Sequence, residues 1–196
     1  MNTPTHLVIN AALNKRFANW TIIKSAWLLG SVAPDIPLYL LSLGGWVYYH
    51  QMLGWSGRET FRHMFDHLFF QDPFWIASHN LLHSPTLLIL ALLIIRVRQG
   101  IEKSLNDWGW WFFWGCLVHT AVDIPVHVND GPLLFFPFNW TIRFYAPVSY
   151  WDEDHFGREV SLVELILDLA LLVYCWLPFL QRGWFRWRGN NRDPSA

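Results

Sequence analysis

The sequence has few charged residues and none of the short motifs that mark many soluble enzymes. Charged side chains make up 15% of its 196 residues, whereas hydrophobic ones make up 53%, including 14 Trp and 15 Phe. This composition is too apolar for an ordinary soluble domain of this size. The chain contains no Gly-rich phosphate loop, GxSxG elbow, CxxC pair or HExxH motif, and no internal repeat. The sequence therefore gives no support to the enzyme classes that those motifs define.

Cysteine is scarce, and a leader sequence is not evident. Cys116 and Cys175 both lie in apolar runs, so we expect buried thiols and no disulfide framework. Residues 1–6 lack a basic stretch, which argues against a cleavable signal peptide. The length suits one domain. We expect residues 1–185 to form a single membrane-embedded domain and residues 186–196 to form a basic, flexible tail.

Long apolar runs are what the sequence has in abundance. A helix needs about 20 apolar residues to cross a bilayer. Four runs approach this length: residues 20–43, 81–97, 108–128 and 160–180. A shorter apolar helix over residues 6–16 is too short to cross and is expected to be buried or re-entrant. The predicted fold is therefore an all-α, polytopic membrane helical bundle with four spans and a short N-terminal helix. Gly44-Gly45 is expected to open a loop after the first span.

The basic residues are distributed unevenly along these runs. Ten of the fourteen would lie on one side of the membrane: Lys15, Arg16, Lys24, Arg96, Arg98, Lys103, Arg182, Arg186, Arg188 and Arg192. The other four lie in two aromatic loops, residues 44–80 and 129–159. Cytoplasmic loops carry an excess of Lys and Arg. We therefore expect an integral protein of the bacterial cytoplasmic (inner) membrane, with its C-terminus in the cytoplasm and its aromatic loops outside.

A histidine and a carboxylate interrupt the third apolar run. His119 and Asp123 are four residues apart, so on a helix they share one face. Polar groups in an apolar surrounding are costly unless they pair with each other, with other polar groups or with a metal. A buried His–Asp hydrogen bond and a metal site are the two interpretations that this pair leaves open.

The positions of other polar residues favour the metal site. Asp35 lies within the first run, His83 lies at the head of the second, and His6 begins the short N-terminal helix. At about 1.5 Å per residue, these residues, His119 and Asp123 lie roughly 15–22 Å from the basic side. Imidazole and carboxylate groups that converge from several helices suit Zn²⁺, and also Mn²⁺, Fe²⁺ or Ni²⁺.

Other residues are weaker candidates for the same site. Asp168 reaches a similar depth in the fourth run, and His79 and His127 lie close in sequence to stronger candidates. His63 and His67 are four residues apart and can form a helical ligand pair, although a solvated amphipathic helix explains them better. A solvated position is likewise the better explanation for each loop arginine, but one of the four can hold a phosphate: Arg58, Arg62, Arg143 and Arg158.

Five motifs in order along the chain carry a resemblance to a known family. They are Thr5-His6, Gly30-Ser31-Val32-Ala33-Pro34-Asp35, His83-Ser84, Gly115-x-x-x-His119-x-x-x-Asp123 and Gly131-Pro132-Leu133-Leu134-Phe135-Phe136-Pro137-Phe138. Over residues 5 to 140 the chain resembles membrane-bound metal-dependent hydrolases of the YdjM/YbcI type. That family is similar in ligand pattern to zinc-dependent phospholipase C. The chain departs from the family pattern at Leu82, where a threonine is usual, and it lacks an Arg-Gly pair after His79.

The resemblance implies a ligand set and a chemistry. The implied metal ligands are His6, Asp35, His83, His119 and Asp123, with Asp35 and Asp123 in catalytic roles and His79, His127 and Asp168 as further candidates. The implied cofactor is a divalent metal, with Zn²⁺ the first candidate and one to three ions per chain. Substrate-binding residues are not indicated.

The expected function is a membrane-embedded hydrolase that uses metal-activated water on an ester or phosphoester at the outer membrane face. The alternative is a non-catalytic metal-binding membrane protein or an ion transporter. The expected partners are membrane lipid and a small-molecule or lipid substrate, with no nucleic acid.

Overall fold

A computed structural model describes residues 1–190 of the chain, and the side chains of residues 1–177. The regular elements of the described part are all helices, and it contains no strand, only an isolated bridge between Leu133 and Arg143. This confirms the all-α prediction. The longer helices are α1 (Thr3–Arg16), α2 (Lys24–Gly30), α3 (Ile36–Gly45), α6 (Pro73–Asn80), α7 (Pro85–Gln99), α9 (Trp108–Asp123) and α10 (Gly157–Asn190). Shorter ones are η1 (Ala33–Asp35), η2 (Trp46–Met52), α4 (Gly57–Arg62), η3 (His63–Leu68), α5 (Phe69–Gln71), α8 (Ile101–Ser104), η4 (Ile124–Val126) and η5 (Glu153–His155).

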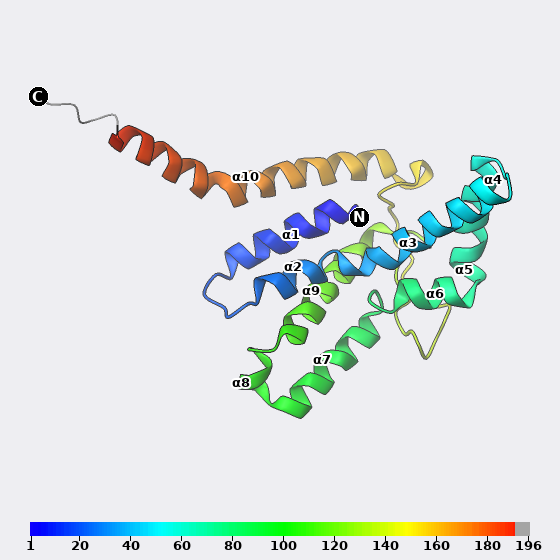
Figure 1. The fold of residues 1–196 in the computed structure, drawn as a ribbon, viewed down its shortest axis with the longest axis horizontal. Helices are drawn as coiled ribbons and strands as arrows, with labels where there is room; N and C mark the ends of the chain where they lie inside the picture. The colour runs from blue at the N-terminus through cyan, green and yellow to red at the C-terminus, as the bar shows by residue number, and fades with distance from the viewer. Residues whose placement is uncertain (191–196) are drawn as a thin grey trace, which may run out of the picture.

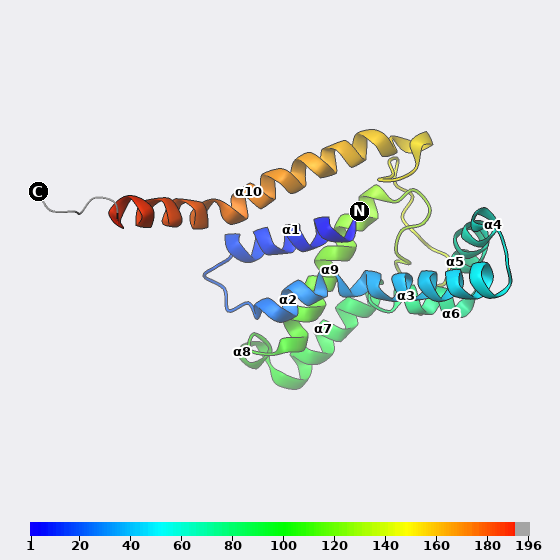
Figure 2. The same cartoon turned by 45° about the horizontal axis from the view of Figure 1, so that its top comes forward.

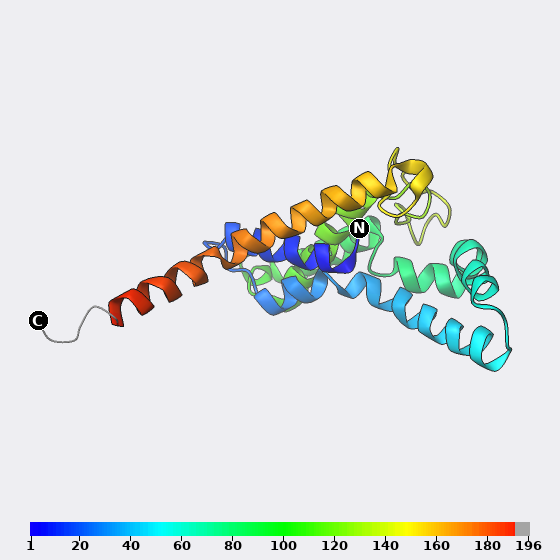
Figure 3. The same ribbon diagram turned by 90° about the horizontal axis from the view of Figure 1, so that it is seen from above.

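The helices form a bundle from which a helical hairpin projects. Helix α10 runs alongside α1, and α9 packs against both α2 and α7 (Figure 1). The hairpin consists of α3 and η2 on one arm and α6 on the other, with α4, η3 and α5 at its tip (Figure 2). Seen from above, the hairpin and the C-terminal end of α10 point to opposite ends of the molecule (Figure 3).

Two glycines allow α2 and α9 to touch through their backbones. A Cβ atom at Gly30 would lie 2.3 Å from the carbonyl oxygen of Phe112, and one at Gly115 would lie 2.5 Å from that of Trp27. Real Cβ atoms do not approach other atoms so closely, so both positions require glycine at this crossing. The Asn10 amide then bridges the two helices, because it donates to the carbonyls of Trp27 and Gly115 at 3.3 Å each. The sequence thus ties α1, α2 and α9 into one unit.

The expectation of a loop at Gly44-Gly45 is wrong. Helix α3 continues without a break into the π-helical segment η2, which ends at Met52. A glycine within a helix costs only about 1 kcal/mol relative to alanine, and packing can offset that cost. Met64 supplies such packing, since its sulfur would lie 2.5 Å from a Cβ at Gly45. The two arms of the hairpin therefore pack closely where the sequence predicted a turn.

One helix in the described part is long and apolar enough to cross a membrane by itself, over Gly157–Leu177. Two bent pairs have the required length and composition only if each pair forms one span: Lys24–Gly30 with Ala33–Met52, bent by 41°, and Pro73–Asn80 with Pro85–Gln99, bent by 50°. Helix α9 has 16 residues, because Pro125 and the short η4 follow it. The four-span arrangement thus stays a prediction.

The predicted boundary between the domain and its tail also stays a prediction. Helix α10 continues through Asn190, beyond residue 185, and residues 191–196 lie outside the described residues.

Candidate metal centre

Four polar side chains from three parts of the chain meet inside the bundle. Asp35 ends η1, His83 lies in the bend between α6 and α7, and His119 and Asp123 share one face of α9. One ligand atom from each lies within 4.8 Å of the other three. The two histidines and Asp123 are buried, whereas Asp35 is partly exposed. Residues that are up to 88 positions apart therefore meet at one point.

The backbone fixes the orientation of both imidazoles. His83 Nδ1 donates to the carbonyl oxygen of His79 at 2.9 Å, and His119 Nδ1 donates to that of Ser31 at 2.7 Å. A carbonyl oxygen can only accept, so each Nδ1 must carry the hydrogen. In the neutral rings, each Nε2 then presents a lone pair. Metal-binding histidines commonly use their other ring nitrogen in this way.

Those two lone pairs point toward each other. His83 Nε2 and His119 Nε2 lie 3.0 Å apart, and neither neutral ring has a hydrogen to place between them. A proton or a metal ion must therefore lie between the nitrogens to make this contact favourable. Two nitrogens bound to one tetrahedral Zn²⁺ at 2.0–2.1 Å would be about 3.3 Å apart. The observed spacing fits such an ion with a small adjustment.

The two carboxylates complete a ring of ligands around the same point. Asp35 Oδ1 lies 3.5 Å from His83 Nε2 and 3.4 Å from His119 Nε2. Asp123 Oδ2 lies 3.7 Å and 3.1 Å from the same two nitrogens. The two carboxylates carry two negative charges, which balance the charge of a divalent cation, and the two imidazoles are neutral. Both are donor types that Zn²⁺ accepts. These residues thus fit the implied metal.

The other oxygen of Asp123 faces a second group of polar side chains. His6 Nε2 lies 3.0 Å from Asp123 Oδ1, and His127 Nε2 lies 3.5 Å from it. The amino group of Met1 donates to the same oxygen at 2.7 Å. Neither ring nitrogen of the buried His6 has the geometry of a hydrogen bond to any described residue. Asp123 therefore lies between two sets of histidines, and its Oδ2 would be available to a divalent metal held with His83 and His119.

Asp35 is the most accessible member of the group. Its side chain is 18% exposed, against 6% for Asp123. The hydroxyl of Thr3 donates to its second oxygen, Oδ2, and contacts the hydroxyl of Tyr39 at 2.8 Å. One oxygen of Asp35 thus faces the histidines while the other is held near the surface. This position suits a group that exchanges protons with a substrate or with water.

The structure places the weaker candidates at different distances from the group. The ring of His79 is tilted against that of His83, with 4.3 Å between ring centroids, and the backbone carbonyl of His79 accepts from His83 Nδ1. Asp168 Oδ2 lies 2.8 Å from Thr5 Oγ1 and is not part of the four-residue group. His63 and His67 stack on each other in η3, 5.4 Å apart, at the tip of the hairpin. They too are not part of the group.

Sequence reasoning did not identify the groups that orient the ligands. The carbonyl oxygens of Ser31 and His79 carry no side-chain signal. Gly30 and Gly115 were the available clue, because they permit the backbone contact that brings Ser31 to His119. Glu164 carries no signal in the sequence beyond being an acid within the fourth apolar run. In the structure it is buried, and its Oε1 lies 2.7 Å from Oγ1 of Thr5, the residue before His6.

Comparison with known proteins agrees with this arrangement at the level of the family. The family model described as YdjM inner membrane protein matches residues 1–185, which include every residue of the metal centre and all of the membrane-spanning candidate in α10. No curated protein and no solved structure matches the chain. Because the match covers nearly the whole chain, the protein belongs to the YdjM inner membrane protein family.

Proposed function

We propose that this protein is a metal-dependent hydrolase embedded in the inner membrane, and that it acts on an ester or phosphoester of lipid-like character at the outer face. One observation carries the proposal. Two imidazole lone pairs and two carboxylates converge on a single point, and one of those carboxylates, Asp35, is accessible. A divalent metal in such a site acts as a Lewis acid and lowers the pKa of water toward 7.

The chain's own residues divide the remaining tasks. His83, His119 and Asp123 hold fixed positions, because each is buried and the backbone orients both rings. Asp35 is both a ligand and the group best placed to accept a proton from water. Burial of the other ligands keeps bulk water from the far side of the centre, which strengthens electrostatic effects there.

The surroundings of the site support a lipid-like substrate. Segment 129–155 follows α9 and η4 and contains exposed aromatic side chains: Phe135, Phe138, Trp140, Phe144, Tyr145 and Trp151. Aromatic residues gather at membrane–water interfaces, where one part of the ring is apolar and another is wet. These side chains would place the opening of the site at the level of lipid head groups.

A second candidate function has its own supporting observation. Structural zinc sites are closed by four protein ligands, whereas catalytic sites keep one position open. The group of Asp35, His83, His119 and Asp123 contains four side chains. If all four bind one ion, the protein is a metal-binding membrane protein without catalysis.

Turnover measurements separate the two candidates. The protein is purified in detergent with its metal and tested on chromogenic phosphodiester, phosphomonoester and carboxylic ester substrates. The proposal expects turnover that is lost in Asp35→Asn while bound metal is largely kept, because asparagine can still place an oxygen near the metal but cannot accept the proton. His67→Ala is the control, since His67 lies at the hairpin tip. Metal binding without turnover on any substrate favours the second candidate.

A further inference from the structure

One loop arginine differs from the other three by its surroundings. Arg143 is partly buried, whereas Arg58, Arg62 and Arg158 are exposed. Arg62 has an acidic partner, since its Nε lies 3.7 Å from Asp66. The guanidinium of Arg143 instead donates to the backbone carbonyl of Gly131. Burial lowers the pKa of Arg143 to about 10.

No carboxylate forms a salt bridge with Arg143 in the part of the chain whose side chains are described, although Asp130 acts on its charge from farther away. Its guanidinium carbon lies over the rings of Phe69 and Phe70, 5.4 Å and 5.6 Å from their centroids. Cation–π contacts of this kind stabilise a cation but satisfy none of its N–H donors. A guanidinium has five such donors, and a carbonyl oxygen satisfies only part of them. Arg143 therefore has donors left for an acceptor.

A second polar group near Arg143 lacks a partner. His79 is 7% exposed, and its Nδ1 has no hydrogen-bond partner among the described residues. The ring of Phe69 contacts both residues, since its centroid is also 5.0 Å from that of His79. Two polar groups that lack hydrogen-bond partners for some of their atoms, His79 from α6 and Arg143 from segment 129–155, thus contact the same phenyl ring.

This pair adjoins the metal centre. The ring of His79 lies 4.3 Å from that of His83, and its carbonyl holds His83 in place. The backbone at Gly131, which accepts from Arg143, lies against His127, and His127 in turn faces Asp123. Arg143 and His79 therefore lie next to residues of the metal centre.

We propose that Arg143 and His79 bind an oxyanion of the substrate, and that the substrate is consequently a phosphoester and not a carboxylic ester. This inference rests on the proposed hydrolase function. A planar guanidinium donates two parallel hydrogen bonds to a phosphate, which lysine cannot do. The oxyanion supplies the acceptor that the partly buried charge lacks. Arg143 is thus a substrate-binding residue that selects a phosphate group, beside the ligands that hold the metal.

Binding of inorganic phosphate tests this inference without turnover. Isothermal titration of the full chain in detergent, in a phosphate-free and sulfate-free buffer, is carried out with metal-loaded and with chelator-treated protein. Arg143→Gln is expected to weaken phosphate binding by about 10- to 100-fold, as removal of a hydrogen bond to a charged group does. Arg143→Lys keeps the charge and is expected to bind with intermediate affinity. Arg158→Gln is the matched control and is expected to bind like the unmutated protein.

The outcomes separate this inference from the proposed function. Equal phosphate affinity in Arg143→Gln and in the unmutated protein overturns the inference, as does absence of phosphate binding by the unmutated protein. Turnover of carboxylic esters without phosphate binding leaves the hydrolase proposal intact and removes the inference. Phosphate binding that depends on Arg143, with no turnover on any substrate, supports the role of Arg143 in phosphate binding and removes the hydrolase proposal. A melting temperature within a few degrees of that of the unmutated protein shows that a variant is folded. If Arg143→Gln does not fold, the phosphate affinity of Arg143→Lys provides the test.

Discussion

The contact between His83 and His119 defines the chemistry of the centre at the scale of single residues. Each ring gives its only hydrogen to a backbone carbonyl, so two lone pairs face each other at 3.0 Å with two carboxylates around them. Such an arrangement is unfavourable without a positive charge at its centre. A protonated imidazole or a metal ion provides that charge. His6 adds a third imidazole beside Asp123, and neither of its nitrogens has hydrogen-bond geometry, so a single proton does not satisfy the whole set.

A second polar contact at this scale holds α10 against α1. Thr5 Oγ1 lies 2.7 Å from Glu164 Oε1 and 2.8 Å from Asp168 Oδ2. A hydroxyl has one hydrogen, so one of these contacts requires a hydrogen from a carboxyl group. Thr5→Val removes both contacts and leaves two acids with fewer partners on the buried side of α10. We expect the free energy of unfolding in detergent to fall by about 1–3 kcal/mol.

The matched control for Thr5→Val is Thr141→Val, at an exposed position in segment 129–155. Thr141 bonds only to Asn139 nearby in the chain, so its replacement should change stability by less than about 0.5 kcal/mol. Equal effects of the two substitutions would show that the Thr5 contacts do not hold α10 in place.

The residues of the centre were predictable, whereas the groups that orient them were not. His119 and Asp123 stand out because ionisable side chains are costly in an apolar run. Asp35, His83 and His6 followed from their depth relative to the basic residues. The carbonyl oxygens of Ser31 and His79 have no signature in a sequence, since every residue has one. Their roles depend on how the chain bends at the two breaks in the helices, which is a tertiary property.

At the scale of helices, the crossing of α2 and α9 determines whether the centre can form. Gly115→Ala would place a Cβ 2.5 Å from the carbonyl oxygen of Trp27 and 3.1 Å from the Cα of Gly30. The helices must then separate, which moves Ser31 away from His119. We expect a loss of about 1–3 kcal/mol in the free energy of unfolding, as for other overpacked sites, together with weaker metal binding.

Gly44→Ala is the control for this substitution, because no atom lies within 4 Å of its Cβ position and Gly44 is also helical. It should leave metal content unchanged and raise stability by up to about 1 kcal/mol, the difference in helix propensity. Thermal unfolding and metal analysis of both variants provide the measurement. Normal metal content in a folded Gly115→Ala protein would contradict the role of the crossing.

Asp107 begins α9 and so helps to set the register of the helix that carries His119 and Asp123. Its carboxylate accepts from the backbone of Trp110 at 2.9 Å and from Gln99 Nε2 at 2.8 Å. The hydrogen bond from Gln99 holds the pKa of Asp107 below its ordinary value of 3.8, burial opposes this shift, and the backbone N–H groups of Trp110 and Gly109 add to it. Asp107→Ala should cost about 1 kcal/mol, whereas Asn106→Ala should cost little.

The effect of Asp107→Ala should depend on pH with a definite sign. A carboxyl group whose pKa is lower in the folded state contributes stability above its unfolded pKa, and that contribution is lost as the pH falls through the folded value. The difference in stability between the unmutated protein and Asp107→Ala should thus be full at neutral pH and shrink below pH 3.8. A difference that stays constant down to pH 2 would show that the charge of Asp107 has no part in capping.

The apolar runs predicted the helices and their approximate positions, but composition alone did not predict where the helices break. Pro34 and Pro85 mark real helix starts, because proline fixes φ and suits the first turn of a helix. Gly44 and Gly45 mark no break, and Met64 and Trp75 pack against Gly45, which offsets its low helix propensity. Which glycines interrupt a helix is decided by neighbours from distant parts of the chain.

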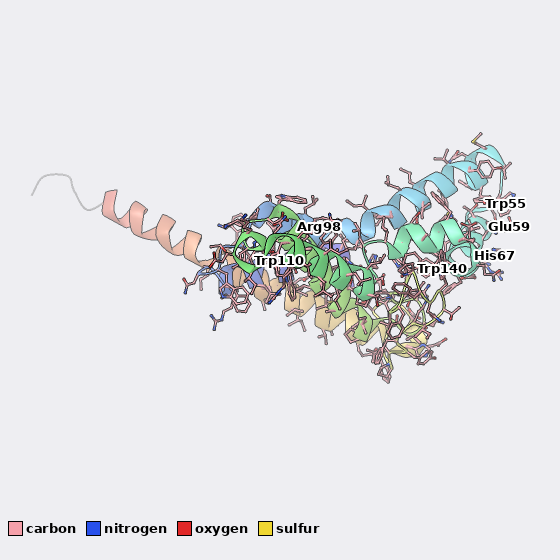
Figure 4. The ribbon with its side chains drawn as sticks, turned by 90° about the horizontal axis from the view of Figure 1, so that it is seen from below. Trp55, Glu59, His67, Arg98, Trp110 and Trp140 are labelled. Carbon is pink, nitrogen blue, oxygen red and sulfur yellow. The ribbon has the colours of Figure 1, made fainter. Side chains whose placement is uncertain are left out.

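Across the whole molecule, the labelled side chains fall into two groups. Arg98 and Trp110 lie near the middle of the long axis, in the helical bundle, whereas Trp55, Glu59, His67 and Trp140 lie toward the end formed by the hairpin (Figure 4). The C-terminal end of α10 projects on the side of the first group (Figure 1). This separation is the one that the positive-inside rule requires if the basic end faces the cytoplasm.

The orientation is testable with reporters in the full chain. A reporter fused after Arg192 is expected to be cytoplasmic, and a small tag inserted after Trp140 is expected to be accessible from outside. The physical reason is the cluster of Lys and Arg at the end opposite to Trp140. An external signal from the C-terminal reporter would mean that the orientation is the reverse of the predicted one, with the metal centre in the inner half of the membrane.

Metal content tests the central claim most directly. The protein is purified in detergent without added metal, and zinc, iron and manganese are measured per chain for the unmutated protein, for His119→Ala and for the control His67→Ala. We predict about one divalent ion or more per chain in the unmutated protein and in His67→Ala, and a large loss in His119→Ala. A folded, unmutated protein that holds no metal, and takes up none when zinc is supplied, would contradict the account.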